Sequence, residues 1–174
     1  MRRNPAQQTL PMAVPPPGSY EIDADSSVLA FTTRHLFGLA PVRGTFRIRG
    51  GTVEITGPLS DSMVHVEVET ASFRTGNPRR DANVRSRRLL DTGRYPVMTF
   101  ASERLSGLAL VGTLTVGPET RPVRLTIDRS RVSGAAFTAH ATTRIDRAEF
   151  GVSAYRGLAG RYLHVDVEVR CVRV

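Results

Sequence analysis

The side chains that could perform chemistry are few and scattered in this sequence. Histidine occurs at His35, His65, His140 and His164. None of these positions shows the H-x-x-x-H or Cys/His spacing that is typical of a metal site. Asp146 and Glu149 flank Arg147, a pattern more typical of a salt-bridged turn than of a general acid/base pair. A phosphate-binding glycine loop and a G-x-S-x-G elbow are also missing, so the sequence predicts no catalytic or metal-binding residue and favours binding over catalysis.

The strand face on which each histidine lies predicts whether its side chain is buried or exposed to solvent. His65 and His164 alternate with valines, which predicts that both face solvent. His140 lies on the threonine-bearing side of its segment, which also indicates an outward face. His35 shares a face with Phe31, so it is either a buried, hydrogen-bonded histidine or a polar group in a cavity. It is therefore the one candidate catalytic group if the protein acts on a small hydrophobic substrate.

The basic residues are all arginine. Lysine does not occur, and the net charge is +8. Arginine favours bidentate contacts with phosphate and carboxylate groups, so a basic surface permits nucleic acid, anionic lipid or phosphorylated ligands as partners. The same charge is also compatible with a solvated surface that binds nothing. Nucleic-acid binders interleave basic residues with exposed aromatic ones, and this pattern is missing, so no nucleic-acid partner is expected.

The length of 174 residues predicts one domain with a substantial core. No run of 18 apolar residues occurs, so no membrane span is expected. The apolar stretch at residues 10–14 is too short and too rich in proline for a signal peptide, which predicts a cytoplasmic protein. We expect residues 1–19 to form a disordered or extended leader and residues 20–174 to form the domain. Deletion of residues 1–18 is expected to leave the melting temperature nearly unchanged. Cys171, the only cysteine, is expected to be a buried small hydrophobe.

Most of the chain alternates apolar and polar residues with a period of two. Residues 64–69 and 163–170 show this pattern, which is typical of strands with one buried face. Gly50-Gly51 predicts a hairpin turn that splits residues 45–55 into two strands. The pattern predicts an all-β fold of about eight to nine antiparallel strands, and a sheet of this size is expected to close into a lipocalin-like barrel. A barrel of about eight strands is wide enough for one slender ligand.

One segment, residues 71–102, interrupts the strand pattern. Asn77 predicts an N-cap, and Pro78 the first residue of a short helix that runs to about Arg88. This helix is too polar to be stable alone in water. At least one of Leu89 and Leu90 at its exit is therefore expected to pack on the barrel, so that the segment forms a lid between two strands.

Seven short motifs in order resemble the YceI-like family, whose members are lipocalin-like barrels that bind polyisoprenoids or similar amphiphiles. The motifs are Y-E-I-D at 20–23, R-H-L at 34–36, V-R-G-T-F at 42–46, A-S-F-R-T-G-N at 71–77 followed by R-D at 80–81, Y-P-V-M-T-F-A-S at 95–102, G-T-L-T-V-G at 112–117 and I-D-R-A-E-F-G-V at 145–152. The resemblance covers nearly all of the chain beyond residue 20. It implies an apolar cavity that binds, sequesters or transports a long-chain lipid, with no other cofactor.

The sequence departs from the usual family pattern around the lid. Asn83 stands where the family usually has histidine, Val84 where it has leucine, and Leu89-Leu90 where it has two phenylalanines. The stretch at residues 146–151 also differs from the usual Asn-Arg-Ser-Asp-Phe-Gly. These replacements keep the expected cavity apolar, change its shape and remove polar groups that could contact a headgroup.

The expected ligand-binding residues combine inward strand positions with the lid. They are Phe31, His35, Phe46, Phe73, Arg80, Asp81, Val84, Leu89, Leu90, Phe100, Leu114 and Phe137. Arg80 and Asp81 either attach the helix to a strand or hold a polar headgroup.

The leading interpretation is a non-enzymatic carrier of an isoprenoid-like lipid that also forms a homodimer. Two alternatives remain: an enzyme acting in the same cavity, and a filled barrel that serves as a stress-response or interaction module.

Overall fold

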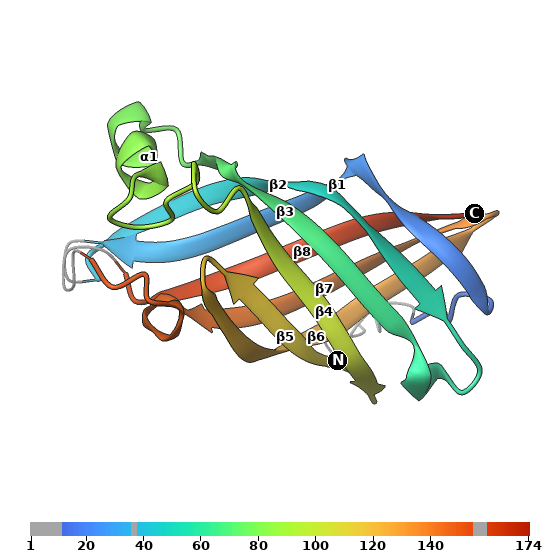
Figure 1. The fold of residues 1–174 in the computed structure, drawn as a ribbon. Coiled ribbons are helices and arrows are strands. Elements are labelled where there is room, and N and C mark those ends of the chain that lie inside the picture. The colour runs from blue at the N-terminus through green and yellow to red at the C-terminus, as the bar shows by residue number, and fades with distance from the viewer. Residues whose placement is uncertain (1–11, 36–37, 155–159) are drawn as a thin grey trace, which may run out of the picture.

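A computed structural model describes residues 12–35, 38–154 and 160–174 of the chain, without the side chain of His35. Eight strands form a closed barrel in which each strand is antiparallel to the next and the last pairs with the first (Figure 1). The strands are β1 (Gly18–His35), β2 (Ala40–Ile55), β3 (Met63–Arg74), β4 (Val97–Ser106), β5 (Ala109–Val116), β6 (Glu119–Ser133), β7 (Ala136–Asp146) and β8 (Tyr162–Arg173). The predicted all-β, lipocalin-like barrel is therefore confirmed.

Short helices occupy three of the connections between strands. The helix α1 (Pro78–Arg85) lies between β3 and β4, and the 3-10 helices η1 (Leu59–Asp61) and η2 (Arg147–Phe150) follow β2 and β7. Figure 1 shows α1 standing over one end of the barrel, which we call the lid end. The C-terminus and the start of β1 lie at the opposite end, which we call the terminal end.

The strand β2 corrects one sequence prediction. Gly50-Gly51 is no hairpin turn, because β2 runs unbroken through both residues and pairs with β3 on each side of them. The register shifts between Ile48 and Gly50, which indicates a β-bulge that bends the strand. A side chain on Gly51 would place Cβ 2.2 Å from the carbonyl oxygen of His65 and 2.8 Å from Cδ1 of Ile22. The second glycine therefore permits a close approach of β2 to β3.

The helix α1 begins as predicted and ends three residues earlier than predicted. The side chain of Asn77 caps it by accepting a hydrogen bond from the N–H of Arg80, and Pro78 occupies the first turn. At Ser86 the backbone becomes extended, and the Ser86 hydroxyl donates a 2.6 Å hydrogen bond to the carbonyl of Asn83. A serine that bonds the backbone in this way competes with helical hydrogen bonding, which explains the early end.

The inward side chains form two apolar clusters, one near each end of the barrel. Near the terminal end, the buried members are Tyr20, Ile22, Ile48, Val53, Phe137 and Cys171. Near the lid end, they are Val68, Met98, Val116 and Phe150. Strand alternation places most of these side chains, since every second one points inward from the closed sheet, and η2 adds Phe150.

Residues 12–17 lie against the terminal end of the barrel. Met12 forms an isolated bridge with Ser130 of β6, and the N–H of Ala13 donates a 3.0 Å hydrogen bond to the Ser130 carbonyl. Pro15 is buried, and the hydroxyl of Tyr20 donates a 2.8 Å hydrogen bond to the carbonyl of Pro16. Residues 1–11 of the predicted leader lie outside the described residues.

These contacts change the expected effect of removing the N-terminal segment. Deletion of residues 1–17 is expected to lower the melting temperature by roughly 5–10 °C, from about 1 kcal/mol for each of a few lost hydrogen bonds. Thermal unfolding followed by circular dichroism measures the change. Deletion of residues 1–11 is the control, because it leaves the contacts of residues 12–17 in place. Equal melting temperatures for both truncated proteins would show that residues 12–17 contribute nothing.

Candidate ligand-binding cavity

Two apolar cavities lie inside the barrel. The larger of the two, of about 280 Å³, lies beneath the lid. The strands contribute most of its wall through inward apolar side chains, and the lid closes one side. Nine of the twelve predicted ligand-binding residues line it: Phe31, Phe46, Phe73, Arg80, Val84, Leu89, Leu90, Phe100 and Leu114. The predicted residues Asp81 and Phe137 lie elsewhere, and the side chain of His35 is outside the described part of the chain.

Three aromatic rings form one wall of this larger cavity. Phe31 stacks on Phe73 with ring centroids 5.4 Å apart, and Phe46 lies 5.6 Å from Phe31 and 5.4 Å from Phe73. Aromatic pairs at this separation attract one another beyond their burial of apolar area. Gly44 allows the arrangement, because a Cβ at this position would lie 2.3 Å from the Phe31 ring. The rings therefore form a rigid apolar surface.

The lid contributes three apolar side chains to the cavity, those of Val84, Leu89 and Leu90. The chain after α1 folds back, so that the N–H of Leu90 donates a 2.9 Å hydrogen bond to the carbonyl of Val84. Leu90 also packs against the core cluster near the lid end. The polar helix α1 is thus held on the barrel by the leucines that follow it.

Asp81 attaches the helix to the loop that precedes it. Only 5 % of Asp81 is exposed, and its carboxylate accepts hydrogen bonds of 3.1 Å from the N–H of Thr75 and one from the Thr75 hydroxyl. The Nε of Arg80 donates a 2.8 Å hydrogen bond to the same hydroxyl. Arg80 and Asp81 therefore act together on Thr75, and Arg80 also lines the cavity.

The polar side chains in the wall of the larger cavity are Thr33, Arg80, Thr143 and Arg147. Arg147 is bonded at both ends of its guanidinium group, by Nε to the carbonyl of Gly160 and by Nη1 to that of Val152. The described lining contains no aspartate, glutamate, histidine or cysteine. Elsewhere in the described ranges, no group of three such residues is arranged to hold a metal ion.

The sequence did not identify several lining residues of the larger cavity. Met98 and Val116 lie two residues from the predicted Phe100 and Leu114, and Val68 lies in the alternating run at residues 64–69. Since every second residue of a strand faces the same side, the alternation could have identified all three. Phe150 is different. It enters the cavity wall because η2 folds back after β7, and no periodicity in the sequence signals that turn.

A second apolar cavity, of about 220 Å³, lies towards the terminal end. Phe137 and Cys171 line this cavity, together with residues 12–15. Val66, Phe100, Leu125 and Val167 line both cavities and form a waist between them. Phe137 therefore belongs to the second chamber, where its ring also packs edge-on to Tyr20 with centroids 5.0 Å apart.

Cys171 is fully buried in the wall of the second cavity, as the sequence predicts. Burial in apolar surroundings raises the pKa of its thiol to about 12. The thiol therefore stays protonated at neutral pH and behaves as a small apolar side chain.

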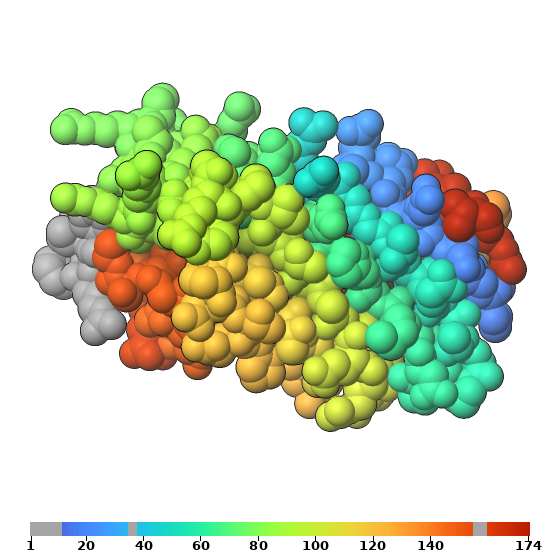
Figure 2. All heavy atoms as spheres, in the orientation of Figure 1, coloured from blue at the N-terminus to red at the C-terminus, as the bar shows by residue number. Residues whose placement is uncertain are grey.

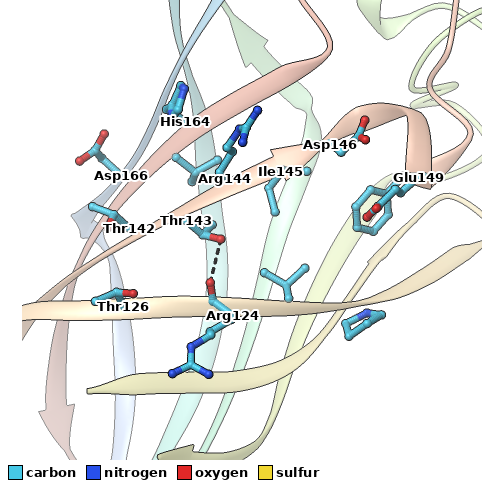
Figure 3. Close-up of a pocket in the computed structure, with 14 residues that line it drawn as sticks. Arg124, Thr126, Thr142, Thr143, Arg144, Ile145, Asp146, Glu149, His164 and Asp166 are labelled. Atoms are coloured by element: carbon cyan, nitrogen blue, oxygen red, sulfur yellow. Dashed lines mark hydrogen bonds between the residues drawn. The ribbon is translucent and has the colours of Figure 1, made fainter. Parts of the chain in front are cut away.

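The barrel wall is interrupted near the lid end, where β6 and β7 separate. Their ladder extends from Ser133↔Ala136 to Thr126↔Thr142, and beyond it the Thr143 hydroxyl donates a 2.9 Å hydrogen bond to the Arg124 carbonyl (Figure 3). A depression on the outer face lies over this gap. Its floor shares five residues with the larger cavity: Val123, Thr143, Ile145, Phe150 and Val165.

The rim of this depression is polar, and its charged side chains do not point towards one common position. Arg124 and Arg144 lie on opposite sides of the gap and point away from each other (Figure 3). The guanidinium group of Arg144 lies 3.7 Å from the Tyr162 ring centroid. Hydrogen bonds from Arg161 hold the pKa of Asp146 below its ordinary value. Asp146 therefore forms a salt bridge, and its partner is Arg161.

Three histidines, His65, His140 and His164, face outward, as predicted. His65 and His164 are exposed on β3 and β8. Nδ1 of His140 lies 2.6 Å from a carboxylate oxygen of Asp128, and its Nε2 lies 3.4 Å from one of Asp166. Both carboxylates lie on the outer surface, so His140 bridges neighbouring strands there.

The family model described as "YceI-like domain" matches residues 20–172. A Yersinia enterocolitica relative, UPF0312 protein YE1254, is 28 % identical over 172 residues, which cover 88 % of this chain and 86 % of that protein. Protein YceI of Escherichia coli is 33 % identical over 114 residues, and this match covers 61 % of this chain and 59 % of that protein.

Solved structures share the fold at lower identity. BcnA of Burkholderia cenocepacia aligns with a TM-score of 0.70 at 20 % identity and covers 86 % of this chain and 98 % of its own. A polyisoprenoid binding domain from Saccharophagus degradans aligns with a TM-score of 0.69 at 17 % identity, covering 89 % and 98 %. Among the described residues, no helix combines the length and the apolar character that crossing a membrane requires.

Proposed function

Because the chain belongs to the YceI-like family, we propose that it binds a polyisoprenoid or a similar long-chain amphiphile inside the barrel. The larger cavity carries this proposal, since its wall is almost entirely apolar and its arginines are already hydrogen-bonded. Burial of an apolar chain there gains about 25 cal/mol per Å² of surface removed from water. The printed description of the Saccharophagus degradans domain as polyisoprenoid binding supports the same ligand class.

The shape of the interior supports a slender ligand. Pockets for small ligands usually measure about 300–1,000 Å³. The larger cavity is near the lower limit, and the two cavities together fall within this range. A chain that crosses the waist at Phe100 and Val167 would use both. The existence of two cavities argues against the filled-barrel alternative.

The composition of the cavity wall also favours a carrier over an enzyme. General acid/base or nucleophilic chemistry needs a titratable group beside the substrate. The described wall of the larger cavity offers only hydroxyls and hydrogen-bonded arginines. We therefore propose sequestration or transport without chemical change. The cytoplasmic location and the homodimer stay predictions from the sequence.

The variant Leu90→Ala tests the proposed function. Leu90 packs against the core cluster on one side and borders an existing cavity on the other, so its truncation is expected to cost less stability in the ligand-free protein than truncation of a fully packed core residue. Loss of the apolar contact should weaken binding of a long-chain isoprenoid alcohol by roughly 5–150-fold, equivalent to about 1–3 kcal/mol. Urea unfolding with and without the isoprenoid measures both quantities for the variant and the parent protein.

The matched control is Ile48→Ala. Ile48 is fully buried near the terminal end and lines neither cavity. Its truncation should cost about 2–5 kcal/mol of stability and leave the affinity of the folded protein unchanged. The carrier proposal is wrong if the isoprenoid does not stabilise the parent protein and Leu90→Ala is as destabilising as the control.

A further inference from the structure

Most of the net charge of the protein is concentrated in the lid. Residues 74–94, which we call the arginine-rich lid, contain seven arginines and two aspartates, a net charge of +5 in a chain whose total is +8. One of the two aspartates, Asp81, is buried and bonded to Thr75. The lid therefore presents mainly positive charge to solvent.

Six of the seven arginines of this lid fall into two groups. Arg80 and Arg85 turn inward and donate hydrogen bonds to Thr75 and to the carbonyl of Phe73. A second group is exposed and takes part in no ion pair between described residues: Arg74, Arg79, Arg87 and Arg94. Figure 2 shows side chains of this green segment extending from the lid end into solvent.

An exposed apolar side chain lies at the same end of the barrel. Leu39 is 83 % exposed in the turn between β1 and β2. The start of β2 lies beside the end of β3, where Thr45 pairs with Arg74, and α1 follows directly. Positive charge and an exposed leucine at the same end of a protein favour docking on the interface of an anionic bilayer.

We propose that the arginine-rich lid docks the barrel on an anionic membrane surface, with the lid over the larger cavity facing the bilayer. This inference rests on the proposed function in one respect, since the membrane would be the source or the acceptor of the bound amphiphile. Nucleic acid fits the lid less well, because single strands are held by stacking on exposed aromatic rings. Tyr95 is the aromatic residue of the lid region, and it is half-buried beside Arg94.

The test is sedimentation of the full-length protein with phospholipid vesicles that contain no isoprenoid. Binding is expected to vesicles of phosphatidylcholine mixed with phosphatidylglycerol, and not to phosphatidylcholine alone. It should weaken as salt is raised, because salt screens exposed charges. The double variant Arg79→Gln/Arg87→Gln should bind the anionic vesicles roughly 25-fold more weakly, about fivefold for each charge removed.

The control removes two exposed arginines from the terminal half of the barrel, Arg104→Gln/Arg131→Gln. The inference is overturned if this control loses as much vesicle binding as the lid variant, or if the parent protein does not bind anionic vesicles. Tighter binding to a single-stranded oligonucleotide that depends on Arg79 and Arg87 would overturn it in favour of nucleic acid.

A separate titration distinguishes this inference from the proposed function. Arg79 and Arg87 do not line the larger cavity, so the lid variant should bind a long-chain isoprenoid alcohol in vesicle-free solution as well as the parent. If the parent protein binds anionic vesicles but does not bind the isoprenoid, the carrier proposal is wrong and the docking surface is still supported.

Discussion

Replacement of Gly51 by alanine is expected to destabilise the barrel by about 3 kcal/mol or more. The added Cβ would lie 2.2 Å from the backbone oxygen of His65, and a backbone atom of a paired strand cannot move without disturbing the ladder. Urea unfolding measures the loss. A thermal scan should show a decrease of roughly 6–12 °C for a domain of this size.

Gly50→Ala is the matched control for this prediction. A Cβ at Gly50 meets no atom within 4 Å, so this neighbour should tolerate alanine with a change below about 1 kcal/mol. The comparison keeps the chemistry constant and moves the methyl group by one residue. Equal effects at the two positions would mean that β2 does not approach β3 as closely as described.

Asp81→Asn is expected to cost about 2–3 kcal/mol of stability and to lower ligand retention at the same time. The carboxylate accepts hydrogen bonds from both the N–H and the hydroxyl of Thr75, and it is almost fully buried. An asparagine amide retains one acceptor oxygen and turns a donor towards the donors of Thr75. The lid should therefore loosen, and a ligand in the cavity beneath it should dissociate faster.

The matched control for this variant is Asp91→Asn. Asp91 has a φ of 48°, a conformation in which asparagine is at least as favourable as aspartate. Stability should therefore be unchanged or slightly higher. If Asp81→Asn left stability intact and altered only the affinity for a charged amphiphile, Asp81 would be a headgroup contact instead of an anchor for the helix.

The architecture could be predicted from the sequence because its physical cause is local. The alternation of apolar and polar residues along β3 and β8 determines which face of each strand is buried. The number of antiparallel strands is too large for a stable open sheet, which predicts that the sheet closes into a barrel. The helix start was also predictable, since Asn77 and Pro78 carry the capping chemistry in two residues. Leu89 and Leu90 followed from the argument that a polar helix needs an apolar attachment.

The features that escaped prediction depend on contacts between distant residues. Gly50-Gly51 has the composition of a hairpin turn, and the close approach of β3 that explains Gly51 is invisible in the local sequence. Phe137 has the same inward parity as the lining residues, but its position along the strand places it beyond the waist. The packing of Pro15 depends on the shape of the terminal end, which composition does not encode.

The gap between β6 and β7 gives the barrel a seam. Residues 119–125 are held by β5 on one side, and residues 143–146 by β8. Opening the seam breaks the Thr143–Arg124 hydrogen bond, worth about 1 kcal/mol, and shifts side chains instead of rupturing a ladder. The ladder of β6 and β7 ends at Thr126↔Thr142, so beyond this pair side chains separate the larger cavity from the outer depression.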